Sequence, residues 1–276
     1  MRTLGTAALV LLLSGCLGGG EAEPTETPEP TGPVYDATQP LSVNYNANQC
    51  REAFVVALVE QAVAQKNLPK GYKAKDAQGL LGLPIAAGRY ALWVNALNCA
   101  QSEFALGGID EGGYGVFVEA PKVEGERAKA TYDFYEFGRY TSKEETLDLL
   151  RSFDYGALEG TVDATITPQA GGVTTGSGQV RNDEGAVVYS LGLTAPANQP
   201  LKVRARFWHE AENGTGYFDY VVDTTVAQGS GSCTIRDLKI REKMGIDSCG
   251  NNAVSMGFPP YKFESQFAWL PGAKAA

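Results

Sequence analysis

Two glutamates lie where their carboxylates could support acid–base chemistry or hold a cation. Glu119 and Glu136 each sit within an apolar and aromatic run, YGVFVEA and YDFYEF respectively. The alternation of side chains along a strand puts Tyr132 on the same face as Glu136. If these faces line the inside of a barrel, the two carboxylates could form an acid–base pair or a cation site. If they face outward, we expect ion pairs with arginines such as Arg139.

The only histidine of the chain, His209, lies in the run RARFWHEAENGTGYFDY. Asn-Gly is typical of a tight hairpin turn, so this run predicts two paired strands that bring Trp208 and His209 opposite the segment that holds Asp219. A histidine among carboxylates and aromatic rings could act as a general base. The alternative is a histidine in ordinary cross-strand packing. The sequence assigns a catalytic role to none of these residues. The candidate pocket residues are Glu119, Tyr132, Glu136, Arg139, Trp208, His209 and Asp219.

The cysteines predict disulfides rather than a metal site. Apart from Cys16 there are four, an even number that is typical of an exported, disulfide-bonded chain. We predict the pairs Cys50–Cys99 and Cys233–Cys249, because each then joins segments that are near in sequence. There is no CxxC spacing and a single histidine, which argues against a metal centre. No phosphate-binding loop is present, and no cofactor is predicted.

Most of the segments that would position these residues have the pattern of strands. The predicted strands cover residues 89–97, 114–120, 130–140, 160–168, 176–182, 186–195, 201–210, 216–227 and 262–270. The run 48–66 has apolar residues at helical spacing, which predicts a helix. A second helix is predicted at 142–153, where Ser142 and Glu145 have the spacing of a capping box.

These segments favour a mainly β (α+β) fold, an antiparallel-rich β-barrel of about nine strands with two flanking helices. Closing a sheet into a barrel removes its exposed edges. The passage through residues 131–168 has a strand, a helix and a strand, which is unusual for an immunoglobulin-like sandwich. The Cys-Trp-Cys spacing of such sandwiches is also missing.

The runs LPKGYKAKDA, LWVNALNC, GGYGVFVEAP and YDFYEFGRYTS resemble the barrel domain of acetoacetate decarboxylase-like proteins, over about residues 68–210. The resemblance implies a β-barrel with an internal cavity for a small acid or ketone. Catalysis in that family uses a Schiff base on a lysine whose pKa is lowered partly by an adjacent lysine. No Lys-Lys or Lys-Arg pair occurs in this chain, which argues against decarboxylase activity.

The first residues predict an exported, lipid-anchored protein. Leu13-Ser14-Gly15-Cys16 follows a short apolar run and resembles the lipobox of bacterial lipoproteins, which implies lipidation of Cys16. Residues 1–15 would then be a signal peptide, and residues 16–40, rich in Gly, Pro, Thr and Glu, a flexible acidic linker. Residues 41–276 are expected to form one β-rich domain. The alternative is an ordinary signal peptide.

Three functions are compatible with this sequence. The formal net charge of −9 argues against a nucleic-acid partner. The leading hypothesis is a small-molecule-binding protein that is held extracytoplasmically on a membrane, at the cell surface or in a periplasm, by its N-terminal lipid. The alternatives are a cofactor-free lyase or hydrolase of decarboxylase-like ancestry, and a structural or adhesive surface protein. The sequence does not predict the oligomeric state.

Overall fold

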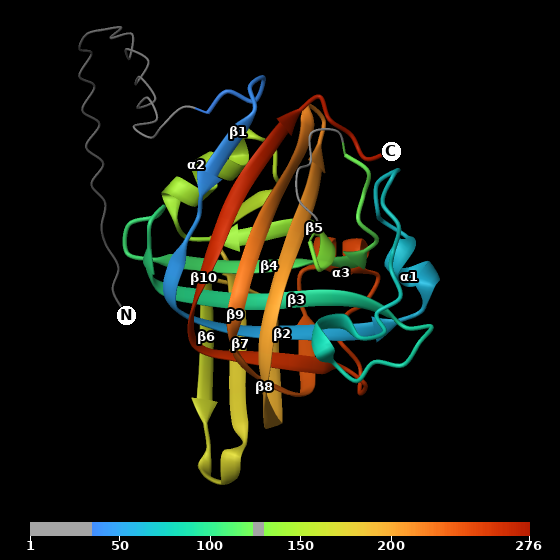
Figure 1. The fold of residues 1–276 in the computed structure, drawn as a ribbon, viewed down its shortest axis with the longest axis vertical. Coiled ribbons are helices and arrows are strands. Elements are labelled where there is room, and N and C mark those ends of the chain that lie inside the picture. The colour runs from blue at the N-terminus through green and yellow to red at the C-terminus, as the bar shows by residue number, and fades with distance from the viewer. Residues whose placement is uncertain (1–34, 124–129) are drawn as a thin grey trace, which may run out of the picture. The chain divides into compact units, whose positions relative to one another are not determined.

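The computed structural model describes residues 35–123 and 130–276, which form a β-barrel (Figure 1). Ten strands make one sheet in the order β1-β10-β2-β3-β4-β5-β6-β7-β8-β9, and the sheet closes because β10 also pairs with β9. All pairings are antiparallel except those of β5 with β6 and with β8. The predicted antiparallel-rich barrel is therefore confirmed. The predicted signal peptide, the lipobox and most of the predicted linker lie outside the described residues.

The elements follow one another along the chain with the following bounds. The strands are β1 (Leu41–Asn44), β2 (Ala47–Val59), β3 (Tyr90–Ser102), β4 (Ile109–Val118), β5 (Tyr132–Thr141), β6 (Ala157–Pro168), β7 (Thr174–Asn182), β8 (Val187–Ala211), β9 (Gly214–Ile235) and β10 (Val254–Pro271). The helices are α1 (Gln61–Gln65), α2 (Glu144–Ser152) and α3 (Leu238–Met244), with short 3-10 turns η1 (Leu80–Gly82) and η2 (Ala170–Gly172).

The barrel has two crossing sets of strands. In Figure 1 the strands β2, β3 and β4 run across the view behind β8, β9 and β10, and the β6–β7 hairpin extends below them. Sheets that cross in this way enclose their core between two inner faces. The inner core between the two sets contains Phe54, Trp93, Phe134, Phe218 and Phe267. A separate outer core on the other face of β2–β4 contains Val55, Val94, Tyr114, Val116 and Tyr189.

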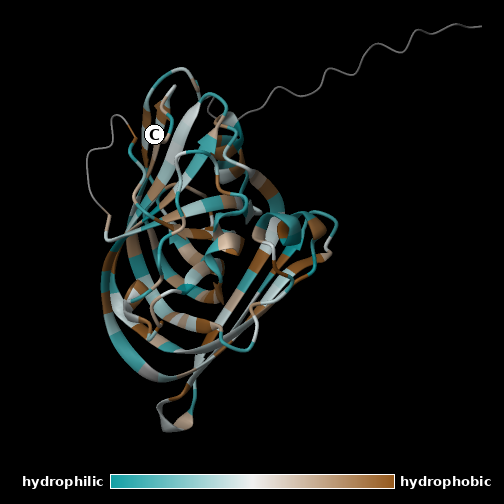
Figure 2. Cartoon of the chain, turned by 90° about the vertical axis from the view of Figure 1, so that its right-hand side faces the viewer, coloured by the Kyte–Doolittle hydropathy of each residue, from teal (hydrophilic) through white to brown (hydrophobic). Residues whose placement is uncertain are grey.

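The predicted helix at 48–66 is wrong, because most of this run forms strand β2. Phe54 and Val56 belong to the inner core, whereas Val55 and Ala57 belong to the outer core, so consecutive residues are buried on opposite faces. Two-sided burial produces a continuous apolar run, which periodicity alone cannot distinguish from a buried helix. Only α1, of five residues, is helical in this run. Figure 2 shows hydrophobic and hydrophilic bands along the strands of the barrel.

The predicted helix at 142–153 is confirmed as α2, but its predicted capping box is wrong. The N-cap is Lys143 and no side chain caps it. The hydroxyl of Ser142 instead donates to a carboxylate oxygen of Asp110, which ties the start of α2 to the start of β4. Buried leucines of α2, Leu149 and Leu150, belong to the inner core. No helix within the described ranges has the length and hydrophobicity that crossing a membrane requires.

Both predicted disulfides are present. Cys50 and Cys99 are directly opposite each other in the β2–β3 pair and are bonded to each other. Cys233, near the end of β9, is bonded to Cys249, and the loop between them contains α3. The first bridge joins two neighbouring strands of the barrel wall, and the second holds α3 beside β9.

Candidate functional site

A cavity lies within the inner core of the barrel. The centre of a water-sized sphere can move through about 70 Å³ of it. One water molecule needs about 10–15 Å³ by this measure, so the cavity has room for roughly five waters or one small organic molecule. Its wall is mainly aliphatic and aromatic, with a polar end. The lining residues are Glu52, Phe54, Leu81, Trp93, Asn95, Leu97, Glu111, Gly113, Phe134, Glu136, Arg139, Leu201, Val203, Ala205, Phe207, Tyr220, Val222, Met256, Phe258 and Tyr261.

A bulge in the β4–β5 pair aims two charged side chains into this cavity. Strict alternation along β5 would put Glu136 and Arg139 on opposite faces of the sheet. Gly115 is opposite Glu136 but Tyr114 is opposite Gly138, so β5 has one extra residue, Phe137, at this point. A bulge re-aims the side chains that follow it. Glu136 and Arg139 therefore share the inner face.

Arg139 is the centre of a buried polar network. Its Nε lies 3.0 Å from Oε1 of Glu136 and its Nη2 lies 2.8 Å from Oε2, a bidentate ion pair. Its Nη1 donates to Oε2 of Glu111 at 2.8 Å and to the hydroxyl of Tyr220 at 3.0 Å. The guanidinium carbon lies 4.0 Å from the ring centroid of Phe218. Four of the five guanidinium N–H groups are thus engaged inside the protein.

Tyrosines complete the network around the two carboxylates. Tyr45 donates its hydroxyl proton to Oε1 of Glu111 at 2.5 Å, and Tyr155 donates to Oε2 of Glu136 at 3.1 Å. The hydroxyl of Tyr45 also lies 2.6 Å from that of Thr146 on α2. Burial raises the pKa of Glu111, and the attraction of Arg139 opposes this effect. The network holds these carboxylates in place and leaves them little freedom to turn toward a ligand.

Glu52 differs from the other carboxylates of the cavity. It is only half-buried, whereas Glu111 and Glu136 are at most 3% exposed. It accepts hydrogen bonds from the amide of Asn95 at 2.7 Å and from the hydroxyl of Tyr261 at 2.9 Å. Burial raises its pKa, and these two hydrogen bonds only partly offset the shift. Within the described residues no cation forms an ion pair with Glu52.

Aromatic rings form one wall beside this carboxylate. Phe54 and Trp93 are stacked with centroids 5.8 Å apart, and Phe134 and Phe207 are stacked at 4.9 Å. The ring of Trp93 also meets the rings of Phe134 and Phe207 edge-on. Its benzo edge approaches Gly113, where a Cβ would lie 2.9 Å from it, so a glycine is needed there. Such rings offer both an apolar surface and a negative π face.

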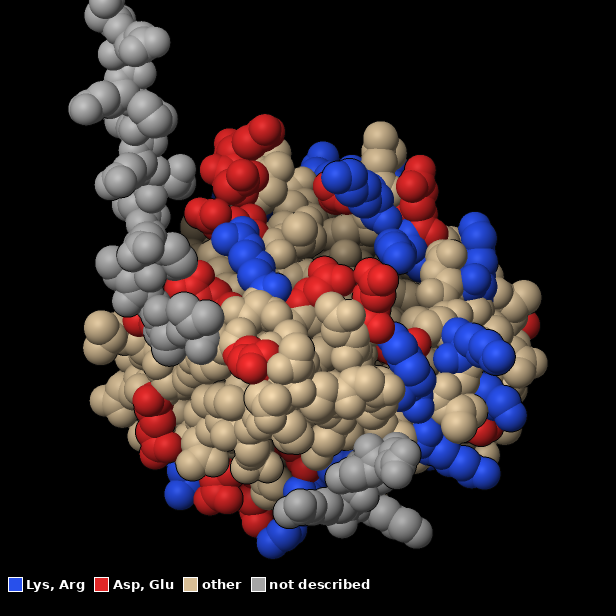
Figure 3. All heavy atoms as spheres, turned by 90° about the horizontal axis from the view of Figure 1, so that it is seen from above, with Lys and Arg blue, Asp and Glu red and all other residues tan. Residues whose placement is uncertain are grey.

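The charges of the lining residues are predominantly negative. Three carboxylates and one guanidinium line the cavity, and none of the lining residues is a lysine. Lys73 and Lys75, which lead into the barrel, are exposed. A Schiff base needs an amine at the ligand, and the described lining offers none. On the outer face that Figure 3 shows, acidic and basic side chains are interspersed.

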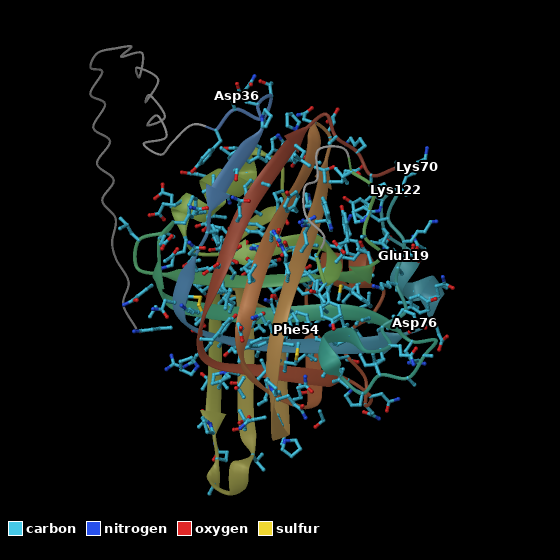
Figure 4. All side chains as sticks on the ribbon, viewed as in Figure 1. Asp36, Phe54, Lys70, Asp76, Glu119 and Lys122 are labelled. Atoms are coloured by element: carbon cyan, nitrogen blue, oxygen red, sulfur yellow. A yellow bond between two sulfur atoms is a disulfide. The ribbon has the colours of Figure 1, made fainter. Side chains whose placement is uncertain are left out.

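The structure brings together two of the predicted pocket residues, Glu136 and Arg139. Glu119 does not reach the cavity: it follows the end of β4 and is exposed, because the strand ends at Val118 before the alternation can continue. Figure 4 shows Phe54 behind the β8–β10 layer and Glu119 toward the margin of the molecule. Tyr132 is half-buried and donates its hydroxyl proton to the carbonyl oxygen of Gly79.

The predicted β8–β9 hairpin is present, with its turn at residues 212–213, but the predicted pocket residues Trp208, His209 and Asp219 lie outside the cavity lining. Trp208 donates its indole proton to Asp133, and Asp219 pairs with Arg206 at 3.0 Å. Both ring nitrogens of His209 lie within hydrogen-bond distance of backbone carbonyl oxygens, those of residues 136 and 154. Burial lowers the pKa of His209. His209 is therefore packed between β5 and the turn that follows α2, with its ring nitrogens directed at backbone oxygens and away from the cavity lining.

Sequence reasoning missed two of the carboxylates, Glu52 and Glu111. Glu52 lies in the run that predicted a helix, so its face could not be assigned. Glu111 lies before the predicted strand at 114–120, whereas β4 begins at Ile109 and includes Glu111, Gly112 and Gly113. The sequence feature that could have indicated this part of the site is the pair Gly112 and Gly113, since a glycine inside a strand often marks a close approach of another group. No group of three or more potential metal ligands occurs in the part of the chain that the structure describes.

Comparisons with known proteins show the fold alone. No family model matches the chain, and no curated protein matches it. The acetoacetate decarboxylase of Legionella pneumophila superposes with a TM-score of 0.54 at 12% identity, covering 94% of this chain and 98% of that one. A second acetoacetate decarboxylase gives 0.50 at 11% identity, covering 85% and 89%. The enduracididine biosynthesis enzyme MppR gives 0.49 at 15% identity, covering 91% and 97%. The two acetoacetate decarboxylase superpositions show that the chain has an acetoacetate decarboxylase-like fold.

Proposed function

We propose that this chain is a small-molecule-binding protein whose ligand occupies the barrel cavity and is not held by a Schiff base. The observation that carries the proposal is a cavity in the barrel core whose lining contains no lysine but does contain Glu52, a carboxylate that accepts two hydrogen bonds and forms no ion pair within the described residues. A concave, mostly apolar pocket with a few convergent polar groups is the usual form of a ligand site. This feature favours a binding protein over a purely structural or adhesive one.

Cavity occupancy is tested with a variant that fills it. Ala205 lines the cavity and is 7% exposed, so Ala205→Leu puts three extra carbon atoms into it. Ala170 lies in η2 and is exposed, which makes Ala170→Leu a matched control. Ligand-observed NMR with benzyl alcohol on the full chain should show binding to the parent and to the control but not to Ala205→Leu. Equal binding to all three proteins would place the ligand elsewhere and contradict the proposal.

The absence of Schiff-base chemistry is tested by trapping. The full chain is incubated with acetoacetate or pyruvate and then with borohydride, and its intact mass is measured. We expect no adduct, because no lysine is among the residues that line the cavity, and a Schiff base needs an amine beside the bound carbonyl. An acetoacetate decarboxylase serves as the positive control for trapping. A stoichiometric adduct on one lysine would overturn this part of the proposal and favour an enzyme of decarboxylase type.

A second candidate function is a cofactor-free enzyme that uses Glu52 as a proton donor. The raised pKa of this half-buried carboxyl is the observation that favours it, since such shifts are common at catalytic sites. The candidate predicts turnover of a bound ligand that is lost in Glu52→Gln while binding of a neutral ligand remains. If the parent protein releases its bound ligands chemically unchanged, the enzyme candidate is wrong and the binding function stands.

We also propose that the chain is exported and held on a membrane through lipidated Cys16. The lipobox-like segment supports this proposal, and so do the two disulfides, because stable disulfides are typical of extracytoplasmic compartments. The acyl chains of a lipidated cysteine contribute about 0.8 kcal/mol per buried CH₂, and two or more chains anchor stably. The predicted linker would then hold the barrel away from the membrane surface.

A further inference from the structure

We propose that the cavity selects a small organic cation, an amine or amidine with an apolar body, and that Glu52 receives its charged nitrogen. This inference rests on the proposed binding function and specifies its ligand class. It differs from the acid or ketone that the resemblance to acetoacetate decarboxylase-like proteins implies.

The charge balance of the cavity opposes an anion. Arg139 is the only cationic side chain in the lining, and it lies between Glu111 and Glu136 with four of its five N–H groups engaged. An organic acid would have to displace one of these carboxylates to reach it. Removing one partner of a buried ion pair leaves the other charge uncompensated and costs several kcal/mol. The guanidinium of Arg139 is therefore a structural part of the cavity lining and is not available to bind an anionic ligand.

Glu52 has unused capacity to accept hydrogen bonds. An ionised carboxylate offers about four lone-pair sites, and Asn95 and Tyr261 occupy one on each oxygen. The remaining sites suit a group that brings several donors and a positive charge, since charge-assisted hydrogen bonds are the stronger kind. An ammonium or amidinium group meets both conditions. A neutral alcohol supplies one donor and no charge.

The rest of the cavity fits an apolar body attached to that nitrogen. Phe54, Trp93 and Phe207 contribute aromatic surface, and Leu97 and Met256 contribute aliphatic surface. An aromatic face also attracts a nearby cation. The volume of about 70 Å³ limits the ligand to roughly the size of benzylamine.

Proton linkage distinguishes a cation from other ligands. Burial raises the pKa of Glu52, and the nearby Glu111 raises it further, whereas Asn95, Tyr261 and Arg139 lower it. The other ionisable groups in the lining are Glu136 on β5 and Tyr220 on β9. A cation stabilises the ionised carboxylate, so its binding releases a proton wherever Glu52 is protonated in the free protein. Amine affinity should therefore rise as the pH rises from 4.5 through the raised pKa of Glu52.

The test uses three ligands of the same shape, benzylamine, benzyl alcohol and benzoate, titrated calorimetrically into the full chain at pH 7. Benzylamine should bind at least about tenfold more tightly than either of the others, the effect of one charge-assisted hydrogen bond. Glu52→Gln should remove this preference and keep the binding of benzyl alcohol, which shows that the variant is folded. Glu119→Gln removes an exposed carboxylate outside the cavity and should behave as the parent.

The outcomes separate this inference from the proposed function. If benzyl alcohol or benzoate binds as tightly as benzylamine, the cavity is a ligand site but not a cation site, and the inference is wrong. If Glu52→Gln keeps the amine preference, another group receives the nitrogen and the inference is wrong. If none of the three ligands binds the parent, both the inference and the proposed function fail.

Discussion

Replacing Arg139 by methionine should destabilise the barrel by about 3–5 kcal/mol, because the change leaves two buried carboxylates without their cation. Arg139 forms ion pairs with Glu111 and Glu136, both at 2.8 Å, and its own side chain is only 4% exposed. For a domain of this size, 1 kcal/mol corresponds to about 2–4 °C in Tm, so the expected loss is about 6–20 °C. Thermal unfolding followed by circular dichroism measures it.

The loss should depend on pH in a defined direction. Burial raises the pKa of Glu111, and Arg139 opposes the rise, so the variant should have a still higher pKa at this carboxyl. A carboxyl whose pKa is higher in the folded state than its unfolded value of 4.5 makes stability fall as the pH rises through the interval between them. The variant should therefore lose more stability relative to the parent at pH 8 than at pH 5.

An exposed ion pair provides the matched control for Arg139→Met. Arg151 and Glu159 lie 3.7 Å apart with about half of each side chain exposed. Arg151→Met should therefore cost no more than about 1 kcal/mol, with little dependence on pH. A loss below about 1 kcal/mol for Arg139→Met, or a loss as large at pH 5 as at pH 8, would refute the role given to the buried network.

Three further predictions concern other parts of the chain. Replacing Cys233 and Cys249 by alanine should lower the free energy of unfolding by about 3 kcal/mol, since the loop they close has about 15 residues. Chemical denaturation measures this loss, and a loss below about 1 kcal/mol would be inconsistent with the prediction. His209 should titrate by NMR with a midpoint below 6.5, because burial disfavours its charged form; a midpoint above 6.5 would contradict the dominant effect of burial on its pKa. Cys16→Ala should move the protein out of the membrane fraction, and unchanged partitioning would disprove the lipid anchor.

The fold class could be predicted because most strands show alternating apolar and polar residues that are bounded by turn residues. Alternation and turn residues located most of the strands from β3 to β10, and Asn213-Gly214 located the β8–β9 hairpin. Strand β2 could not be recognised, since its residues Phe54 to Ala57 are buried alternately in two different cores. The disulfide partners were predicted from nearness in sequence, and Cys50–Cys99 then proved to join adjacent strands.

The candidate site could be predicted only in part, because ring closure brings its residues together from distant strands. Glu136 was recognisable as a carboxylate among aromatic residues. Its pairing with Arg139 on one face depends on the bulge at Phe137, which alternation does not predict. Glu52 and Glu111 come from β2 and β4, and nothing in their local sequence shows that both face the same cavity.

A crystal structure of the full chain with benzylamine would test the central claim most directly. We predict that the ring lies in the barrel cavity against Phe54 and Trp93, with the nitrogen within about 3.2 Å of a carboxylate oxygen of Glu52. The Arg139 network should remain as it is without the ligand. A ligand bound outside the barrel, or one inside the cavity whose nitrogen points away from Glu52, would contradict the claim.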